Sequence, residues 1–282
     1  MLGKLMKYEF RATGRVFLPM YAVLLVMSVL ARIFYSGRFG AFSDQHFGVL
    51  LLRIAVTLLM VMLFTAVAVV TLALILRRFG RNLLGREGYL MNVLPVSPWQ
   101  HVTGKLIVSG IWFLLSILAG TLAMAIMLSA VPGLDFKIGW AEMWRSLREG
   151  WSFFRAEGAS FRVVILLAEL ILLVLSRVAL FILSVYAAMC LGQLANRHRV
   201  WLGVGCWIGI NTLISIVQSV YFVAAFGSGG ERLFGDDRVW TTLSALTQAN
   251  IQLGLFLLIS LCFCALLFFV TGRILQKRLN LQ

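Results

Sequence analysis

Six long apolar runs are the feature that most constrains how this chain can fold. They cover residues 16–35, 54–76, 106–130, 163–191, 200–226 and 251–272, and each has at least 20 residues. At about 1.5 Å rise per residue, a helix of that length crosses the ~30 Å hydrocarbon core of a bilayer. The runs lack the strict alternation of barrel strands, so only helices can satisfy their backbone in lipid. The sequence predicts an all-α, polytopic membrane protein: one transmembrane domain over residues 1–282, with six transmembrane helices.

The basic residues between these runs predict the orientation of the chain. Both termini and the loops on the same side hold 14 Lys and Arg residues against two acids, Glu9 and Glu87. The opposite loops hold nine basic residues against eight acids. Because cytoplasmic loops carry the excess of Lys and Arg, we expect both termini inside a multi-pass cell-membrane protein. The net charge of +14 fits this topology and attraction to membrane lipids, and its dispersal among helix ends argues against nucleic-acid binding.

Residues 1–15 predict a short interfacial helix that lies along the inner leaflet. Its basic side chains recur at helical spacing on one stripe: Lys4, Lys7, Arg11 and Arg15. Pro19 then predicts a bend into the first span. The alternative is that these residues are only a positively charged flank of that span.

The outer loop 133–162 predicts an amphipathic helix between spans three and four. Its large apolar residues follow helical spacing: Trp140, Met143, Trp144, Leu147, Trp151 and Phe154. Tryptophan favours the headgroup region, so we expect this helix at the outer leaflet. Two interpretations stay open, a membrane anchor and a lid beside a substrate exit.

Between spans two and three, residues 77–105 form a polar, basic insert. Leu83, Leu90, Met91 and Leu94 fall near one face of a short helix, which Pro95 would end. Ser97-Pro98-Trp99-Gln100 then predicts a new helix start, with serine as cap, proline in the first turn and glutamine closing a capping box. That helix continues into the third span, so its first turns should project into the cytoplasm as a rigid lever.

Two stretches resemble the permease subunits of ABC transporters of the ABC-2 type (type V exporter) class. They are MLGKLMKYEF at Met1–Phe10 and EGYLMNVLPVSPWQ at Glu87–Gln100, the second followed by Gly104-Lys105. The resemblance covers the full length and implies an N-terminal elbow helix and a coupling helix in the insert. It implies that an ATPase subunit docks on Glu87, Tyr89, Leu90, Leu94 and Pro95, to which the apolar face of the insert adds Met91.

The resemblance also implies partners and a class of substrate. Two permease copies, as a homodimer or heterodimer, would assemble with two ATPases and export an amphipathic or hydrophobic lipid, peptide or drug from a bacterial cell. The chain has no Gly-x-x-x-x-Gly-Lys-[Ser/Thr] loop, since Gly104-Lys105 is followed by leucine. We therefore expect no cofactor in this chain, with ATP and Mg in the partner. The Trp-rich outer loop departs from the family, which often has little there.

Other chemistry has weaker support. The three histidines lie on different loops, without a His-Glu-x-x-His motif, so neither a metal site nor a membrane enzyme is indicated. The four cysteines fall in apolar runs and indicate no disulfide framework. A non-transporting scaffold or sensor protein remains the alternative to a permease.

Charged residues inside a span predict a further site. Glu169 and Arg177 are eight residues apart on one run, about 12 Å along a helix, so they should not pair directly. An arginine near mid-bilayer costs ~2.5–3.5 kcal/mol on insertion scales and should face protein or water. Two interpretations stay open: a hydrogen bond from Arg177 to Asn211 or Gln218 on a neighbouring helix, and contact with substrate or another subunit.

Overall fold

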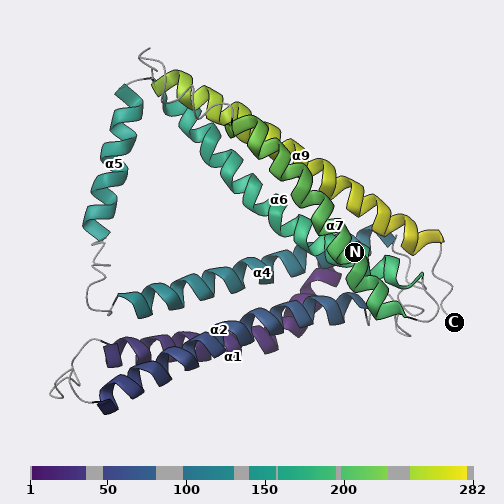
Figure 1. Cartoon of the computed structure of the whole chain (residues 1–282), viewed down its shortest axis with the longest axis horizontal. Coiled ribbons are helices and arrows are strands. Elements are labelled where there is room, and N and C mark those ends of the chain that lie inside the picture. Colours follow the sequence, from purple (N-terminus) through teal and green to yellow (C-terminus); the bar gives the residue numbers. More distant parts are fainter. Residues whose placement is uncertain are drawn as a thin grey trace. The chain divides into compact units, whose positions relative to one another are not determined.

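Helices make up nearly all of the computed structural model, which describes residues 2–35, 47–80, 98–129, 140–156, 158–194, 198–227 and 242–277. Within these ranges there is no strand. Figure 1 labels the helices α1 (Leu2–Tyr35), α2 (Phe47–Phe79), α4 (Pro98–Leu128), α5 (Trp140–Ala156), α6 (Ser160–Gly192), α7 (Arg199–Phe222) and α9 (Thr242–Lys277). A π-helix at Val223–Gly227 continues α7.

Six of these helices, all except α5, are long and apolar enough to cross a membrane. Many of their large apolar side chains are exposed, for example Leu118 on α4 at 62%. Such exposure suits helices whose surroundings are lipid tails. The chain is therefore an all-α, multi-pass membrane protein, as the apolar runs predicted.

The helix predicted for residues 1–15 is continuous with the first span, because α1 passes through Pro19 as one helix of 34 residues. The bend predicted at Pro19 stays a prediction. A proline inside a helix removes one N–H donor, but neighbouring helices in a membrane protein compensate for the lost bond. Residues 1–15 are thus the first turns of the first spanning helix, where the side chains of Lys7, Arg11 and Arg15 are exposed.

The observed ends of the other helices can be compared with the ends that the sequence predicted. As the capping pattern predicted, α4 begins at Pro98, and the outer loop does contain a helix, α5. However, α2 begins at Phe47 and α9 at Thr242, both earlier than the apolar runs indicated. Arg53, which directly precedes the apolar run 54–76, consequently lies inside α2. Hydropathy marks the hydrocarbon core, whereas a helix continues through polar residues into the headgroup region.

The chain divides into two compact units. The first unit is Met1–Arg78 with Thr103–Met143, and it contains α1, α2 and most of α4. Phe17 of α1 stacks on Trp112 of α4, with ring centroids 4.6 Å apart. The Tyr21 hydroxyl lies 2.6 Å from Ser116 Oγ, which lies 3.0 Å from Thr71 Oγ1. These hydroxyls join α1, α4 and α2 inside an otherwise apolar interface.

The second unit is Phe79–Val102 with Trp144–Gln282, and α6, α7 and α9 lie side by side in it (Figure 1). Hydrogen bonds from Asn250 to the Arg162 carbonyl and from Cys264 to the Ser176 carbonyl show that α6 and α9 are parallel. The middle and C-terminal part of α6 supplies most of the buried residues of this unit. The polar side chains among these buried residues, Ser176 and Ser184, therefore influence which polar groups this unit can bind.

The face of α5 that the sequence predicted as apolar is exposed. Trp144 and Leu147 are each 55% exposed, and Trp151 is 36% exposed. These positions recur at helical spacing and suit contact with a lipid surface. Whether α5 is an anchor or a lid stays a prediction.

Candidate functional site

Arg177 lies at the centre of a polar network in the second unit. Its Nη1 donates a hydrogen bond to Gln218 Oε1 on α7, and its guanidinium lies 5.0 Å from the ring centroid of Phe256 on α9. Gln218 is buried and donates through Nε2 to Ser260 Oγ on α9, at 3.5 Å. The network joins α6, α7 and α9. The hydrogen bond to Gln218 is one of the two that the sequence predicted.

No anion balances the charge of Arg177 within the part of the chain that the structure describes. The amide oxygen of Gln218 and the ring of Phe256 are both neutral. Glu169 lies elsewhere, facing α9, where a Cβ on Gly254 would be 3.3 Å from Glu169 Oε1. Glu169 and Arg177 therefore do not form the direct pair that their spacing already argued against.

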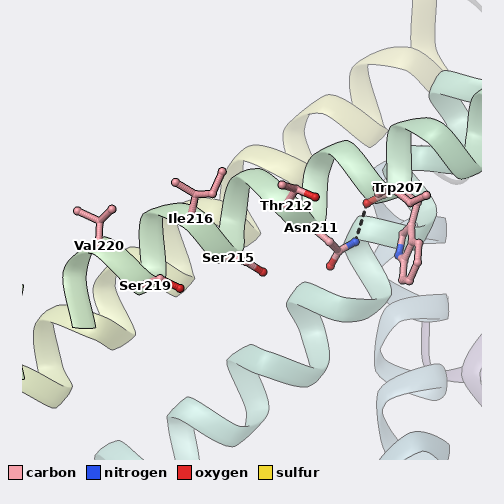
Figure 2. A pocket seen from close by; sticks show the side chains of 8 residues that line it. Trp207, Asn211, Thr212, Ser215, Ile216, Ser219 and Val220 are labelled. Carbon is pink, nitrogen blue, oxygen red and sulfur yellow. Dashed lines mark hydrogen bonds between the residues drawn. The ribbon is translucent and has the colours of Figure 1, made fainter. Parts of the chain in front are cut away.

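A shallow groove of about 520 Å³ runs along one side of α7. Figure 2 shows its lining, which is Trp207, Ile208, Asn211, Thr212, Ser215, Ile216, Ser219 and Val220. These residues recur at helical spacing, so they form one stripe of mixed polar and apolar character. The groove is open along its length rather than enclosed.

Three hydroxyls in this groove, those of Thr212, Ser215 and Ser219, make no hydrogen bond to any other described residue. By contrast, Ser176 and Ser184 on α6 each donate to a carbonyl one turn back, at 2.8 Å. A hydroxyl without a partner in an apolar environment is costly. These hydroxyls are therefore free to bind a polar group that enters the groove.

The structure brings Asn211 and Gln218 to the same helix contact as Arg177. Asn211 donates to the Trp207 carbonyl at 2.8 Å and lies 3.4 Å from Ser184 Oγ, two turns beyond Arg177 on α6. Ser260 and Phe256 could not be predicted from the sequence, because neighbours on another helix leave no local signal. The regular spacing of Asn211, Ser215 and Ser219 was visible in the sequence and could have indicated the groove.

A second polar site lies in the first unit, where Glu9 binds two cations. Its Oε2 accepts a hydrogen bond from Arg78 Nη1, and its Oε1 accepts one from Lys105 Nζ at 3.1 Å. Lys105 is 4% exposed and also approaches the Arg78 carbonyl, at 3.4 Å. From the sequence these residues were only topology signals. In the structure they tie the start of α1 to both ends of the insert.

In the second unit, neighbouring residues hold the same insert by aromatic contacts. Phe79 stacks on Tyr186 of α6 with ring centroids 3.9 Å apart, and Trp99 packs against Phe268 of α9 at 5.3 Å. Trp99 also lies so close to Gly272 that no Cβ would fit there. The residues that flank segment 81–97 are thus firmly held.

The segment itself lies outside the described residues, and so do its predicted docking residues. They are Glu87, Tyr89, Leu90, Met91, Leu94 and Pro95. Their contact with an ATPase stays a prediction.

Metal binding has no support in the described ranges, where no cluster of three or more His, Cys, Asp or Glu residues could hold an ion. The cysteines Cys190, Cys206, Cys262 and Cys264 are free thiols. Comparison of the chain with family models, curated proteins and solved structures found no match.

Proposed function

We propose that this chain is the membrane-spanning permease subunit of an ABC exporter of the ABC-2 type. It moves an amphipathic or hydrophobic molecule, such as a lipid, peptide or drug, out of the cell. A separate ATPase subunit binds ATP and Mg and drives transport, and a second permease copy completes the membrane part. The observation that carries this proposal is the way both ends of the insert 77–105 are anchored.

The anchors suit a segment that transmits force. Arg78 and Lys105, near the two ends of the insert, share Glu9 in a largely buried ion cluster. Separating one partner from a buried ion pair is strongly destabilising. The three side chains should therefore stay together when the insert moves, and the cluster should act as a rigid link. Phe79 and Trp99 make the corresponding contacts with α6 and α9. A partner that moves the insert would therefore move the helices attached to it.

The second unit offers a place for the transported molecule. An uncompensated arginine and an open groove with free hydroxyls are unusual in helices that face lipid, since polar groups there are costly and mark substrate pathways. A scaffold that only assembles other proteins has no need of such a groove. Export of a molecule with both polar and apolar parts accounts for both features.

The test is a double substitution in the insert, Leu90→Ala/Leu94→Ala. Apolar anchors buried at an interface typically contribute ~2 kcal/mol or more each, so the variant should lose its ATPase while it still inserts in the membrane. Copurification of the ATPase and substrate-stimulated ATP hydrolysis are the measurements.

The matched control is Leu115→Ala/Leu118→Ala on α4, where the two side chains are 38% and 62% exposed. This pair removes the same atoms from a lipid-facing surface and should leave the complex intact. Unchanged ATPase recovery and unchanged hydrolysis with the Leu90/Leu94 variant would contradict the docking role.

A further inference from the structure

Arg177 lies near the middle of α6, and therefore near mid-bilayer when α6 spans the membrane. It follows Ser160 by 17 residues and precedes Gly192 by 15, which is roughly 25 Å and 22 Å at about 1.5 Å per residue. An arginine at that depth needs an anion, water or a polar group around it. Gln218 supplies one acceptor, which leaves most of the five N–H donors of the guanidinium for another partner.

Among the described residues of α6, α7 and α9, Glu169 is the only carboxylate. Of the 11 acidic residues of the chain, only Glu169 falls within an apolar run, and it lies eight residues away from Arg177 on the same helix. A second copy of the chain would bring the same set of acids at the same depths. The described helices of this unit thus leave Arg177 open to an anion from another molecule.

The α7 groove flanks Gln218, the residue of α7 that Arg177 binds, although neither Arg177 nor Gln218 lines the groove. Gln218, which accepts the hydrogen bond from Arg177, stands between the lining residues Ser215 and Ser219. These two serines and Thr212 offer free hydroxyls, and Ile216 and Val220 add apolar surface to the groove. In Figure 2 the two serines point to one side of the α7 ribbon, and Thr212, Ile216 and Val220 point to the other. One cation, several hydroxyl donors and an apolar wall together complement a molecule with an anionic head and an apolar tail.

We infer that Arg177 and the α7 groove, lined by Thr212, Ser215 and Ser219, bind the anionic head of an amphipathic molecule. The head is a phosphate or a carboxylate, because the guanidinium fork matches both in a bidentate way. This inference rests on the proposed export function and names the chemical class of its substrate. Gln218 and Phe256 act as positioning residues, since they hold the guanidinium and leave its other donors open.

The test uses the full-length protein, purified without an ATPase and placed in phosphatidylcholine nanodiscs. Three probes share the same apolar tail: dodecyl phosphate, laurate and dodecyltrimethylammonium. Native mass spectrometry at a series of probe concentrations measures the affinity for each. The unchanged protein should bind both anions at least about tenfold more tightly than the cation, since charge-assisted hydrogen bonds are worth that much or more.

Variants then test whether the preference for anionic probes depends on Arg177 and the α7 groove. Arg177→Gln should abolish it, Arg177→Lys should keep part of it, and Ser215→Ala/Ser219→Ala should weaken anion binding several-fold. Arg199→Gln removes an exposed charge at the start of α7, and Thr65→Ala removes an exposed hydroxyl that already donates to the Val61 carbonyl at 2.8 Å. Both control variants should bind like the unchanged protein. If Arg177→Gln does not fold, Arg177→Lys and the serine pair decide the question.

A further arm separates two sources of the anionic head. If phosphatidylglycerol in the nanodisc displaces dodecyl phosphate only when Arg177 is present, the natural ligand is a bilayer lipid. If it does not compete, a single-chain amphiphile is the ligand. Equal affinity for the anionic and cationic probes, or anion binding unchanged in Arg177→Lys and in the serine pair, would overturn the inference. Because no ATPase is present, such a result leaves the proposed export function untouched, whereas failure to recover an ATPase leaves the binding result standing.

Discussion

Glu9 is the single residue on which the ion cluster of the first unit depends. One carboxylate serves two cations, with Oε2 toward Arg78 and Oε1 toward Lys105. The side chain of Glu9 is 12% exposed and that of Lys105 is 4% exposed, so water can do little to replace a lost partner. The two cations would repel each other without the carboxylate between them.

Glu9→Gln should therefore destabilise the protein by about 3 kcal/mol, the size expected when one partner of a buried pair is removed. The double variant Glu9→Gln/Lys105→Met should recover part of that loss, because it also removes the lysine charge. Thermal unfolding in detergent of the single and double variants measures the coupling. Glu142→Gln on exposed α5 is the control and should unfold as the unchanged protein does. Strictly additive effects of the two substitutions would show that Glu9 and Lys105 do not act together.

At the scale of helices, the backbones of α6 and α7 approach each other closely where α6 ends and α7 begins. A Cβ on Gly192 would lie 2.7 Å from the Arg199 carbonyl oxygen and 2.9 Å from the Cα of Gly203. Both are backbone atoms, which cannot rotate away as a side chain can. Glycine at this position therefore allows two helix backbones to meet, as small residues do at other membrane helix contacts.

Gly192→Ala should consequently destabilise the α6–α7 contact by about 1–3 kcal/mol, the usual cost of overpacking. Gly209→Ala is the matched control, since a Cβ there meets nothing within 4 Å. The control should be neutral or slightly stabilising, because alanine favours the helix. Thermal unfolding of both variants in the same detergent compares them. Equal stability of the two alanine variants would mean that the backbones do not meet in the folded protein.

The sequence predicted the individual helices better than it predicted the contacts between them. Apolar runs revealed six spans because lipid imposes length and composition on each helix separately. The start of α4 at Pro98 was predictable, since a serine, a proline and a glutamine give a local capping signal. The contact of Arg177 with Phe256 was not, because it joins residues of α6 and α9 that are far apart in the sequence. The continuity of α1 through Pro19 likewise depends on tertiary packing rather than on proline alone.

At the scale of the whole molecule, charge decides which ends of the helices face the cytoplasm. The 14 basic residues on one side include Arg78 and Lys105, which the structure binds to Glu9. Their role in the structure is thus to bind Glu9, and their role in topology stays a prediction. The exposed charges of α1 at Lys7, Arg11 and Arg15 keep the simpler role of facing water and anionic headgroups. The orientation itself stays a prediction that labelling can decide.

Single cysteines placed in a cysteine-free background test that orientation with an impermeant thiol reagent. His101 is 2% exposed, so a cysteine there would react poorly on either side, and the exposed Gln100 is the better reporter of the same helix end. Gln100→Cys and His198→Cys should be protected in intact cells and react once the membrane is opened. Arg148→Cys on α5 and Asp236→Cys should react in intact cells, because their loops face outward if both termini are inside. The opened membranes serve as the control for reactivity at all four positions. Labelling of His198→Cys in intact cells as strongly as Asp236→Cys would reject the orientation, and with it the cytoplasmic location of the insert on which an ATPase must dock.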